Sequence, residues 1–190
     1  MKKLEIALSF LIGIAFIMKL MNWPYNSLIL ALSATLLGML YFGLGFILLN
    51  GIRLRDIAKK SSYQHISALG IIGAICLGFV FSFIVIYMLF KIQFWPYGQM
   101  GLKLSLGMLL VSIVVFFIFY VMKRRRLLKE NIIRIIIIGG LGTLLYFTDS
   151  MSLVELFYRN DPDRLEHFRQ EIQNLEVYET RRKDSTSSAE

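Results

Sequence analysis

Cysteine, histidine and proline are scarce in this 190-residue chain, which contains one cysteine, two histidines and three prolines. The lone Cys76 cannot form an intramolecular disulfide, and it has no partner at metal-binding spacing. His65 and His167 lie about a hundred residues apart on polar segments. We therefore expect no cofactor and no metal site, and we interpret Cys76 as a packing residue in an apolar run.

Acidic residues are rare in positions 1–150, which contain only Glu5, Asp56, Glu130 and Asp149. None of them lies near the middle of an apolar run, where transporters usually place their acidic residues. The phosphate-binding loop, the Gly-x-Ser-x-Gly elbow and the His-Glu-x-x-His zinc motif are also missing. The sequence therefore predicts a protein that is not an enzyme.

Apolar residues dominate what is present, at 56% of the chain, and the mean hydropathy is +0.62. A soluble domain needs a more polar surface than this composition supplies. The net charge is +11 over residues 1–150 and −3 over residues 151–190. This distribution predicts a membrane domain with a basic edge and a charged tail, and it gives no reason to expect nucleic-acid binding.

Five apolar stretches are long enough to suggest membrane-spanning helices, at 4–21, 25–49, 66–90, 99–122 and 132–148. The expected fold is therefore an all-α polytopic membrane protein with about five transmembrane helices. The last stretch has only 17 residues and carries Arg134 in its first turn. An interfacial or re-entrant position is the alternative for this stretch.

Positive charge gathers at three places that lie on one side of the membrane if every stretch spans. These are the N-terminus, the linker 51–65 and the loop 123–131, which begins with Lys123, Arg124, Arg125 and Arg126. The positive-inside rule makes this side cytoplasmic, and the basic run also suits anionic lipid headgroups. We expect a bacterial inner-membrane protein with a cytoplasmic N-terminus and a periplasmic tail.

A duplicated motif lies between the apolar stretches of each half. An offset of 72 positions aligns two copies of Lys-x-x-x-Trp-Pro-Tyr, formed by Lys19, Trp23, Pro24 and Tyr25 and by Lys91, Trp95, Pro96 and Tyr97. Because an even number of spans separates the copies, residues 1–50 and 66–122 are predicted to be two parallel hairpin repeats.

The residue types of this motif suit a tight turn between two helices at the membrane surface. Tryptophan and tyrosine favour the headgroup layer, and proline disfavours continuation of a helix. We expect Lys19 and Lys91 to extend outward to the same interface. The alternative is that the two lysines form an anion-attracting mouth between the repeats.

Small residues recur every four positions in the third stretch, at Gly70, Ala74, Gly78 and Ser82. Such a stripe allows two helix backbones to approach closely. It suits packing within the chain, and homodimerisation is the alternative.

The polar tail, residues 149–180, contains one helical pattern. Asp161 and Pro162 suit the start of a helix, and an apolar face follows at Leu165, Phe168, Ile172 and Leu175. This face is predicted to dock on the membrane domain or on a partner. Residues 181–190 have the composition of a disordered end.

The turn motif, leading directly into a second helix, resembles the transmembrane hairpin of the gliding-motility protein GldL of Bacteroidetes. It is also similar to small multi-pass membrane proteins of that phylum that carry the turn twice. The resemblance covers about residues 10–50 and 82–122. GldL belongs to a proton-driven motor that relies on a carboxylate in its second helix, whereas this chain has none at 25–49 or 99–122. The resemblance therefore implies the hairpin and not the motor activity.

Together these features favour a non-enzymatic structural or accessory subunit, or a scaffold, that contacts membrane lipids and binds another membrane protein or a second copy. The alternative is a small solute or ion conduit at the interface of the two repeats.

Overall fold

The computed structural model of the chain describes residues 2–52, 59, 68–123, 129–159, 161–170, 173–174 and 177. Every regular element in these residues is a helix, which confirms the all-α prediction. Most of the predicted linker 51–65, most of the loop 123–131 and all of the end 181–190 lie outside the described residues.

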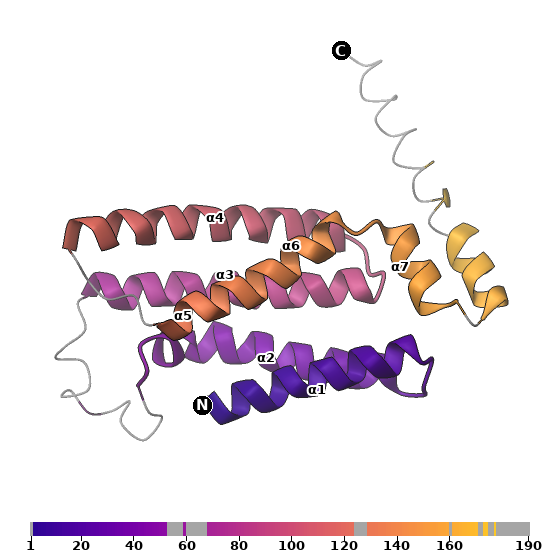
Figure 1. Cartoon of the computed structure of the whole chain (residues 1–190), viewed down its shortest axis with the longest axis horizontal. Helices are drawn as coiled ribbons and strands as arrows, with labels where there is room; N and C mark the ends of the chain where they lie inside the picture. Colours follow the sequence, from indigo (N-terminus) through magenta and orange to yellow (C-terminus); the bar gives the residue numbers. More distant parts are fainter. Residues whose placement is uncertain are drawn as a thin grey trace, which may run out of the picture.

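Two long helical hairpins form most of the bundle (Figure 1). The first consists of α1 (Lys2–Leu20) and α2 (Asn26–Leu49), and the second of α3 (Ala68–Ile92) and α4 (Gly98–Lys123). Both short turns, at 21–25 and 93–97, lie at the same end of the bundle, which we call the turn end. The opposite end, where α1 begins and α4 ends, is the linker end.

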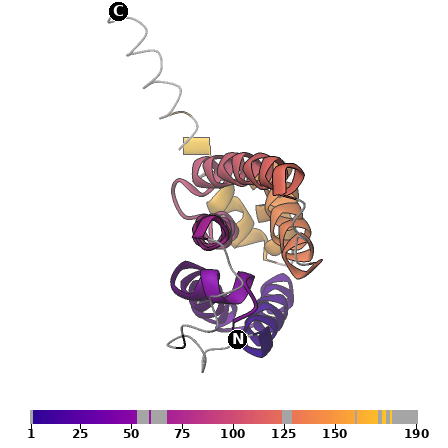
Figure 2. The same ribbon diagram turned by 90° about the vertical axis from the view of Figure 1, so that its left-hand side faces the viewer.

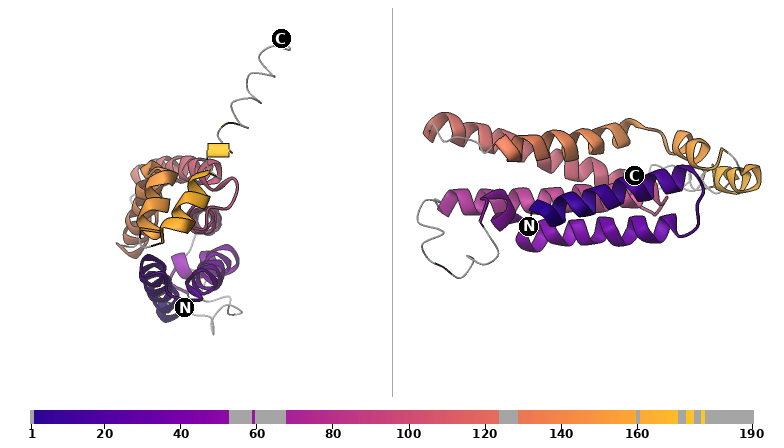
Figure 3. Two further views of the ribbon diagram at one scale, coloured as in Figure 1. Left: turned by 90° about the vertical axis from the view of Figure 1, so that its right-hand side faces the viewer. Right: turned by 60° about the horizontal axis from the view of Figure 1, so that its bottom comes forward.

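A third helical arm crosses the second hairpin. It is formed by α5 (Lys129–Arg134), the π-helix η3 (Ile135–Gly139) and α6 (Gly140–Phe147), which continue one another without a break. After Phe147 the chain bends by 98° into α7 (Ser150–Phe157), and residues 162–170 are also helical. These last segments lie across the turn end (Figure 3).

Helix α3 occupies the middle of the bundle. It packs against α2 on one side and α4 on the other, and it also contacts η3 and α6. The view along the helices shows α1 and the α5–α6 arm on the same side of the α2–α3 pair (Figure 2). This placement brings the first and the fifth predicted spans near each other.

Among the described residues, three helical segments are long and apolar enough to cross a membrane, at Asn26–Leu49, Ile71–Ile92 and Gly98–Val115. The number rises to four if the bent pair Asn131–Phe147 and Ser150–Phe157 is one span. Helix α1 has 19 residues but carries Lys2, Lys3, Glu5 and Lys19, so it is more polar than these three. The structure therefore supports a membrane-embedded helical protein, and five crossings stays a prediction.

A close contact between helix backbones joins α2 and α3 through small residues. A Cβ atom built on Gly45 would lie 2.8 Å from the Cα of Gly78, and one built on Gly78 would lie 2.8 Å from the carbonyl oxygen of Tyr41. Further along, Gly38 faces Ser82 and Ile86. The stripe on α3 is therefore used within the chain, because only residues without bulk permit this backbone approach.

The first turn closes α1 with a left-handed residue that is not glycine. Asn22 has φ 53°, its N–H donates to the carbonyl of Lys19, and the N–H of Trp23 donates to the carbonyl of Met18 at 3.0 Å. This pair of bonds is the Schellman arrangement that satisfies the last carbonyls of a helix. Tyr25, with φ 63°, then precedes α2.

The second turn has the same backbone geometry. Phe94 has φ 57° and donates to the carbonyl of Lys91, while the N–H of Trp95 donates to the carbonyl of Phe90 at 2.8 Å. Tyr97, with φ 65°, precedes α4 as Tyr25 precedes α2. Each proline motif thus has one left-handed residue before the proline, where a helix ends, and one after it, where the next helix begins. At Tyr25, Phe94 and Tyr97 this conformation costs about 1–2 kcal/mol each.

Candidate functional site

Four charged side chains are buried in the described part of the bundle, namely Glu5, Lys19, Lys91 and Arg134. Charged groups inside a membrane domain are costly unless they are paired, and they mark the first candidates for function. They form one cluster at the linker end and a pair of sites at the turn end.

The linker-end cluster centres on a two-bonded ion pair between Glu5 and Arg134. Arg134 Nε lies 2.7 Å from Glu5 Oε1, and Arg134 Nη2 lies 2.7 Å from Glu5 Oε2. The Tyr41 hydroxyl donates to Glu5 Oε1 at 2.6 Å. The carboxylate therefore has three strong donors, from α2 and α5, and this combination holds its charge in a dry environment.

Asn131 extends this cluster to a helix end. Its side-chain oxygen accepts from Arg134 Nη1 at 3.1 Å, and its nitrogen donates to the carbonyl of Leu49 at 3.0 Å. Leu49 is the last residue of α2, where carbonyls lack partners within the helix. One polar network therefore ties α1, α2 and α5 together.

Lys91 binds the end of α6 at the turn end. Its ammonium donates to the carbonyl oxygens of Thr148 at 2.7 Å and Tyr146 at 3.2 Å, and to the side chain of Gln99. Gln99 in turn donates to the Tyr146 carbonyl at 3.1 Å. The lysine thus caps the C-terminus of the third arm, where a positive charge is favourable.

Lys19 lies in an aromatic environment instead. Its ammonium is 5.2 Å from the ring centre of Phe157 and 5.8 Å from that of Phe94, and it donates to Gln93 Oε1 at 3.1 Å. Gln93 also donates to the carbonyl of Ser27 at 2.8 Å. Cation–π contacts of this kind favour a desolvated cation over a ring face.

The prediction that these two lysines extend outward is wrong, because each is only 4% exposed. The physical reason is that α6 and α7 return to the turn end and supply carbonyls and aromatic rings there. The neighbouring rings do lie at the surface, with Trp23, Tyr25, Trp95 and Tyr97 all exposed.

The C-terminal segment closes the turn end through aromatic contacts. Phe157 is almost fully buried, with ring centres 5.6 Å from Phe16 and 6.3 Å from Phe94. Phe168 follows, at 5.5 Å from Phe94 and stacked on Tyr158 at 4.8 Å. Burial raises the pKa of the Tyr158 phenol above its usual value, as expected for a dehydrated contact.

The tail helix begins as its sequence predicts. Asp161 Oδ1 accepts from the N–H of Arg164 at 3.2 Å, which is an N-cap hydrogen bond. Of the predicted docking face, Phe168 packs on the bundle and Leu165 is partly exposed, whereas Ile172 and Leu175 lie outside the described residues.

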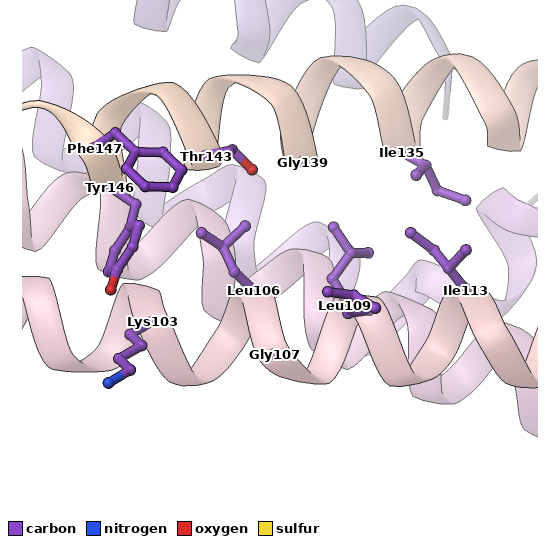
Figure 4. Close-up of a pocket in the computed structure, with 11 residues that line it drawn as sticks. Lys103, Leu106, Gly107, Leu109, Ile113, Ile135, Gly139, Thr143, Tyr146 and Phe147 are labelled. Atoms are coloured by element: carbon purple, nitrogen blue, oxygen red, sulfur yellow. The ribbon is translucent and has the colours of Figure 1, made fainter.

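An apolar groove of about 400 Å³ lies along the contact between α4 and the η3–α6 arm (Figure 4). Leu106, Leu109 and Ile113 line it from α4, and Ile135, Gly139 and Thr143 line it from the arm. Lys103, Tyr146 and Phe147 lie at its turn-end limit. Nothing in the sequence analysis predicted this groove.

Other predicted residues fall outside these sites. Cys76 is exposed on α3, so the interpretation of it as a packing residue is wrong for the bundle as it stands. Lys123 is the last residue of α4, and Arg124, Arg125 and Arg126 are not described. Among the described residues, no three His, Cys, Asp or Glu side chains gather as a metal site requires.

Comparisons with protein-family models, with curated proteins and with solved structures find no match to this chain.

Proposed function

We propose that this protein is a non-enzymatic subunit or scaffold of the bacterial inner membrane that associates with another membrane protein. In this proposal the chain crosses the membrane five times, with the N-terminus in the cytoplasm and the polar tail in the periplasm. The basic segments of the sequence, at the N-terminus, between α2 and α3 and between α4 and α5, support this orientation.

The observation that carries the proposal is the internal pairing of the buried charges. Glu5 and Arg134 bind each other, Lys91 binds carbonyl oxygens of the arm, and Lys19 is held by Gln93 and two rings. No buried side-chain nitrogen or oxygen among the described residues lacks a hydrogen-bond partner. A transport path needs polar groups that can exchange partners with a substrate, whereas fixed pairs favour a static support.

The tight packing of α2 against α3 also favours a scaffold over a conduit between the hairpins. The Gly45–Gly78 contact lies directly at that interface. Lys19 and Lys91, the only residues that suggested an anion mouth there, are buried against other elements.

Two matching turns support the proposal that the hairpins are duplicated. Left-handed residues occur at Asn22 and Tyr25 and again 72 positions later, at Phe94 and Tyr97. In this proposal the chain is similar to the GldL hairpin in architecture and not in motor activity. The one acidic residue of the two hairpins, Glu5, is bound by an arginine and is unsuited to carry protons.

The outer face of α1 is the surface that we assign to a partner. The small residues of α3 are used against α2, and Phe168 packs on the turn end. Helix α1 contacts α2 and α7 and leaves an exposed apolar stripe at Ile6, Phe10, Ile14 and Ile17. The spacing of this stripe suits packing against one further helix.

Photocrosslinking in membranes tests this function. A benzoylphenylalanine residue replaces Phe10 on α1 or, as the matched control, Leu32 on the exposed face of α2. We expect one protein adduct at a fixed ratio from position 10 and none from position 32, identified by mass spectrometry. A version that ends at Arg159 measures the contribution of the tail. Lipid adducts alone at both positions, together with solute flux in liposomes, would overturn the proposal in favour of a conduit.

A further inference from the structure

We propose that the groove between α4 and the η3–α6 arm binds one acyl chain of a phospholipid, and that Lys103 binds the phosphate of the same lipid. This groove is a different surface from the α1 stripe, and lipid binding there does not depend on the identity of a protein partner.

The groove is apolar and partly open. Its volume of about 400 Å³ lies within the range of ligand pockets, about 300–1,000 Å³. A Cβ atom built on Gly107 would meet no atom within 4 Å, so this glycine leaves space that no neighbour fills. On the other wall, Gly139 brings the arm close to Leu109. Empty apolar space of this kind costs packing energy unless something occupies it.

The length of the groove favours a lipid chain over a transmembrane helix. On α4 its lining runs from Lys103 to Ile113, ten residues or about 15 Å. The hydrocarbon core is about 30 Å thick, so this length equals one leaflet. An acyl chain fills one leaflet, whereas a helix packed along the groove would need contacts over about twice the length.

Lys103 supplies a positive charge at the turn end of the groove, where the phosphate of the lipid would lie. In the part of the chain that the structure describes, it makes no hydrogen bond and no ion pair, in contrast to the buried Lys19 and Lys91. Figure 4 shows its stem at the limit of the groove and its ammonium directed out of it. This arrangement suits an acyl chain inside and an anionic group outside.

The depth of Lys103 agrees with a phosphate partner. Helix α4 has 26 residues, about 39 Å, so a centred core of about 30 Å begins about 4–5 Å from Gly98. Lys103 is five residues, about 7.5 Å, from Gly98. Its Cα therefore lies about 3 Å inside the core boundary, from where a lysine side chain reaches the headgroup layer.

Native mass spectrometry of the full-length protein tests the proposal. The protein is released from nanodiscs that contain phosphatidylcholine with either dipalmitoyl phosphatidylglycerol or dipalmitoylglycerol, which has the same chains and no phosphate. We expect one retained phosphatidylglycerol per chain and much less dipalmitoylglycerol. Inorganic phosphate at millimolar concentration should not displace the lipid, because the acyl chain supplies most of the binding.

Gly107→Leu fills the groove, and Gly43→Leu is its matched control, since both glycines have open space around the Cβ position. We expect Gly107→Leu to abolish lipid retention and Gly43→Leu to leave it unchanged. Lys103→Gln should weaken retention about fivefold, the effect of one lysine at an anionic headgroup, and Lys103→Arg should restore it.

Three results would overturn the proposal. Equal lipid retention by Gly107→Leu and the native chain would show that the lipid does not bind in the groove. Equal binding of dipalmitoylglycerol and phosphatidylglycerol would show that Lys103 does not bind the lipid phosphate. A native dimer that Gly107→Leu converts to a monomer would assign the groove to a second copy of the chain.

Discussion

Glu5 and Arg134 stand 129 positions apart in the chain, and each oxygen of the carboxylate lies 2.7 Å from a guanidinium nitrogen. The pair joins the first helix to the arm that follows the second hairpin. Neither residue is more than 9% exposed. Because water cannot replace either partner, each side chain depends on the other.

Glu5→Gln tests this dependence. Removal of one charge leaves Arg134 buried and uncompensated, and we expect a loss of about 3–5 kcal/mol in the free energy of unfolding. Unfolding in mixed detergent micelles measures it. Glu155→Gln is the control, because its pair with Arg169 is exposed and contributes less than about 1 kcal/mol. The double variant Glu5→Leu with Arg134→Met should recover most of the loss; a double variant as unstable as Glu5→Gln would contradict the explanation.

The two lysines of the repeated motif should respond differently to methionine. Lys91→Met leaves the Tyr146 and Thr148 carbonyls without their charged donor, and we expect a loss of about 3 kcal/mol. Lys19→Met should cost less than about 1 kcal/mol, because a thioether packs well against the rings of Phe94 and Phe157. Thermal unfolding in detergent compares them, and equal losses would show that the motif has one role in both copies.

The Gly45–Gly78 contact predicts a sharp difference between two nearby glycines of α2. Gly45→Ala places a methyl group against the α3 backbone and should destabilise the bundle by about 1–3 kcal/mol. Gly43→Ala meets open space and should be neutral or stabilise by up to about 1 kcal/mol. The same unfolding assay distinguishes them. If Gly45→Ala left the free energy of unfolding unchanged, α2 and α3 would have to move apart at little cost.

At the second turn, glycine should be favourable at one left-handed residue and unfavourable at the other. Tyr97 is exposed, so Tyr97→Gly relieves strain and should stabilise the protein in detergent by about 1 kcal/mol. Phe94→Gly relieves similar strain but removes contacts to Phe157 and Phe168, and we expect a net loss of about 2 kcal/mol. If both variants gained stability, the aromatic closure of the turn end would be unimportant.

Phe157 should control access to Lys19. Phe157→Ala removes a buried ring and should cost about 3–5 kcal/mol, and it opens the ammonium of Lys19 to water. Acetylation of the folded protein, followed by mass spectrometry, reports the reactivity of this lysine. Phe147→Ala is the control, because the Phe147 ring is exposed and is not one of the two rings that face the Lys19 ammonium. Unchanged acetylation of Lys19 in Phe157→Ala would contradict the aromatic enclosure.

The long helices could be predicted because apolar residues dominate each of them over a length that can cross a membrane. The stretches 25–49 and 99–122 match α2 and α4 to within one residue at each end. The turns were also visible, since a proline between tryptophan and tyrosine ends a helix. The left-handed residues were not, because an asparagine and a phenylalanine there replace the glycine usual at a helix C-terminus.

The ion pair between Glu5 and Arg134 was not predicted from the sequence. Glu5 and Arg134 each interrupt an apolar stretch, and both lie at the linker end. Their opposite signs were a usable signal, because an isolated charge in such a stretch requires a partner. The direction of Lys19 and Lys91 could not be found in this way, since it depends on a bend after Phe147 that brings α7 across the turn end.

The distant pairing of Glu5 also sets an order of events during synthesis. The ribosome adds about 5–20 residues per second, so Arg134 follows Glu5 by about 6–26 s. Throughout that interval the first helix carries an acidic side chain whose arginine does not yet exist. Nascent chains that stop before the third arm therefore carry this carboxylate with the Tyr41 hydroxyl as a donor but without its arginine.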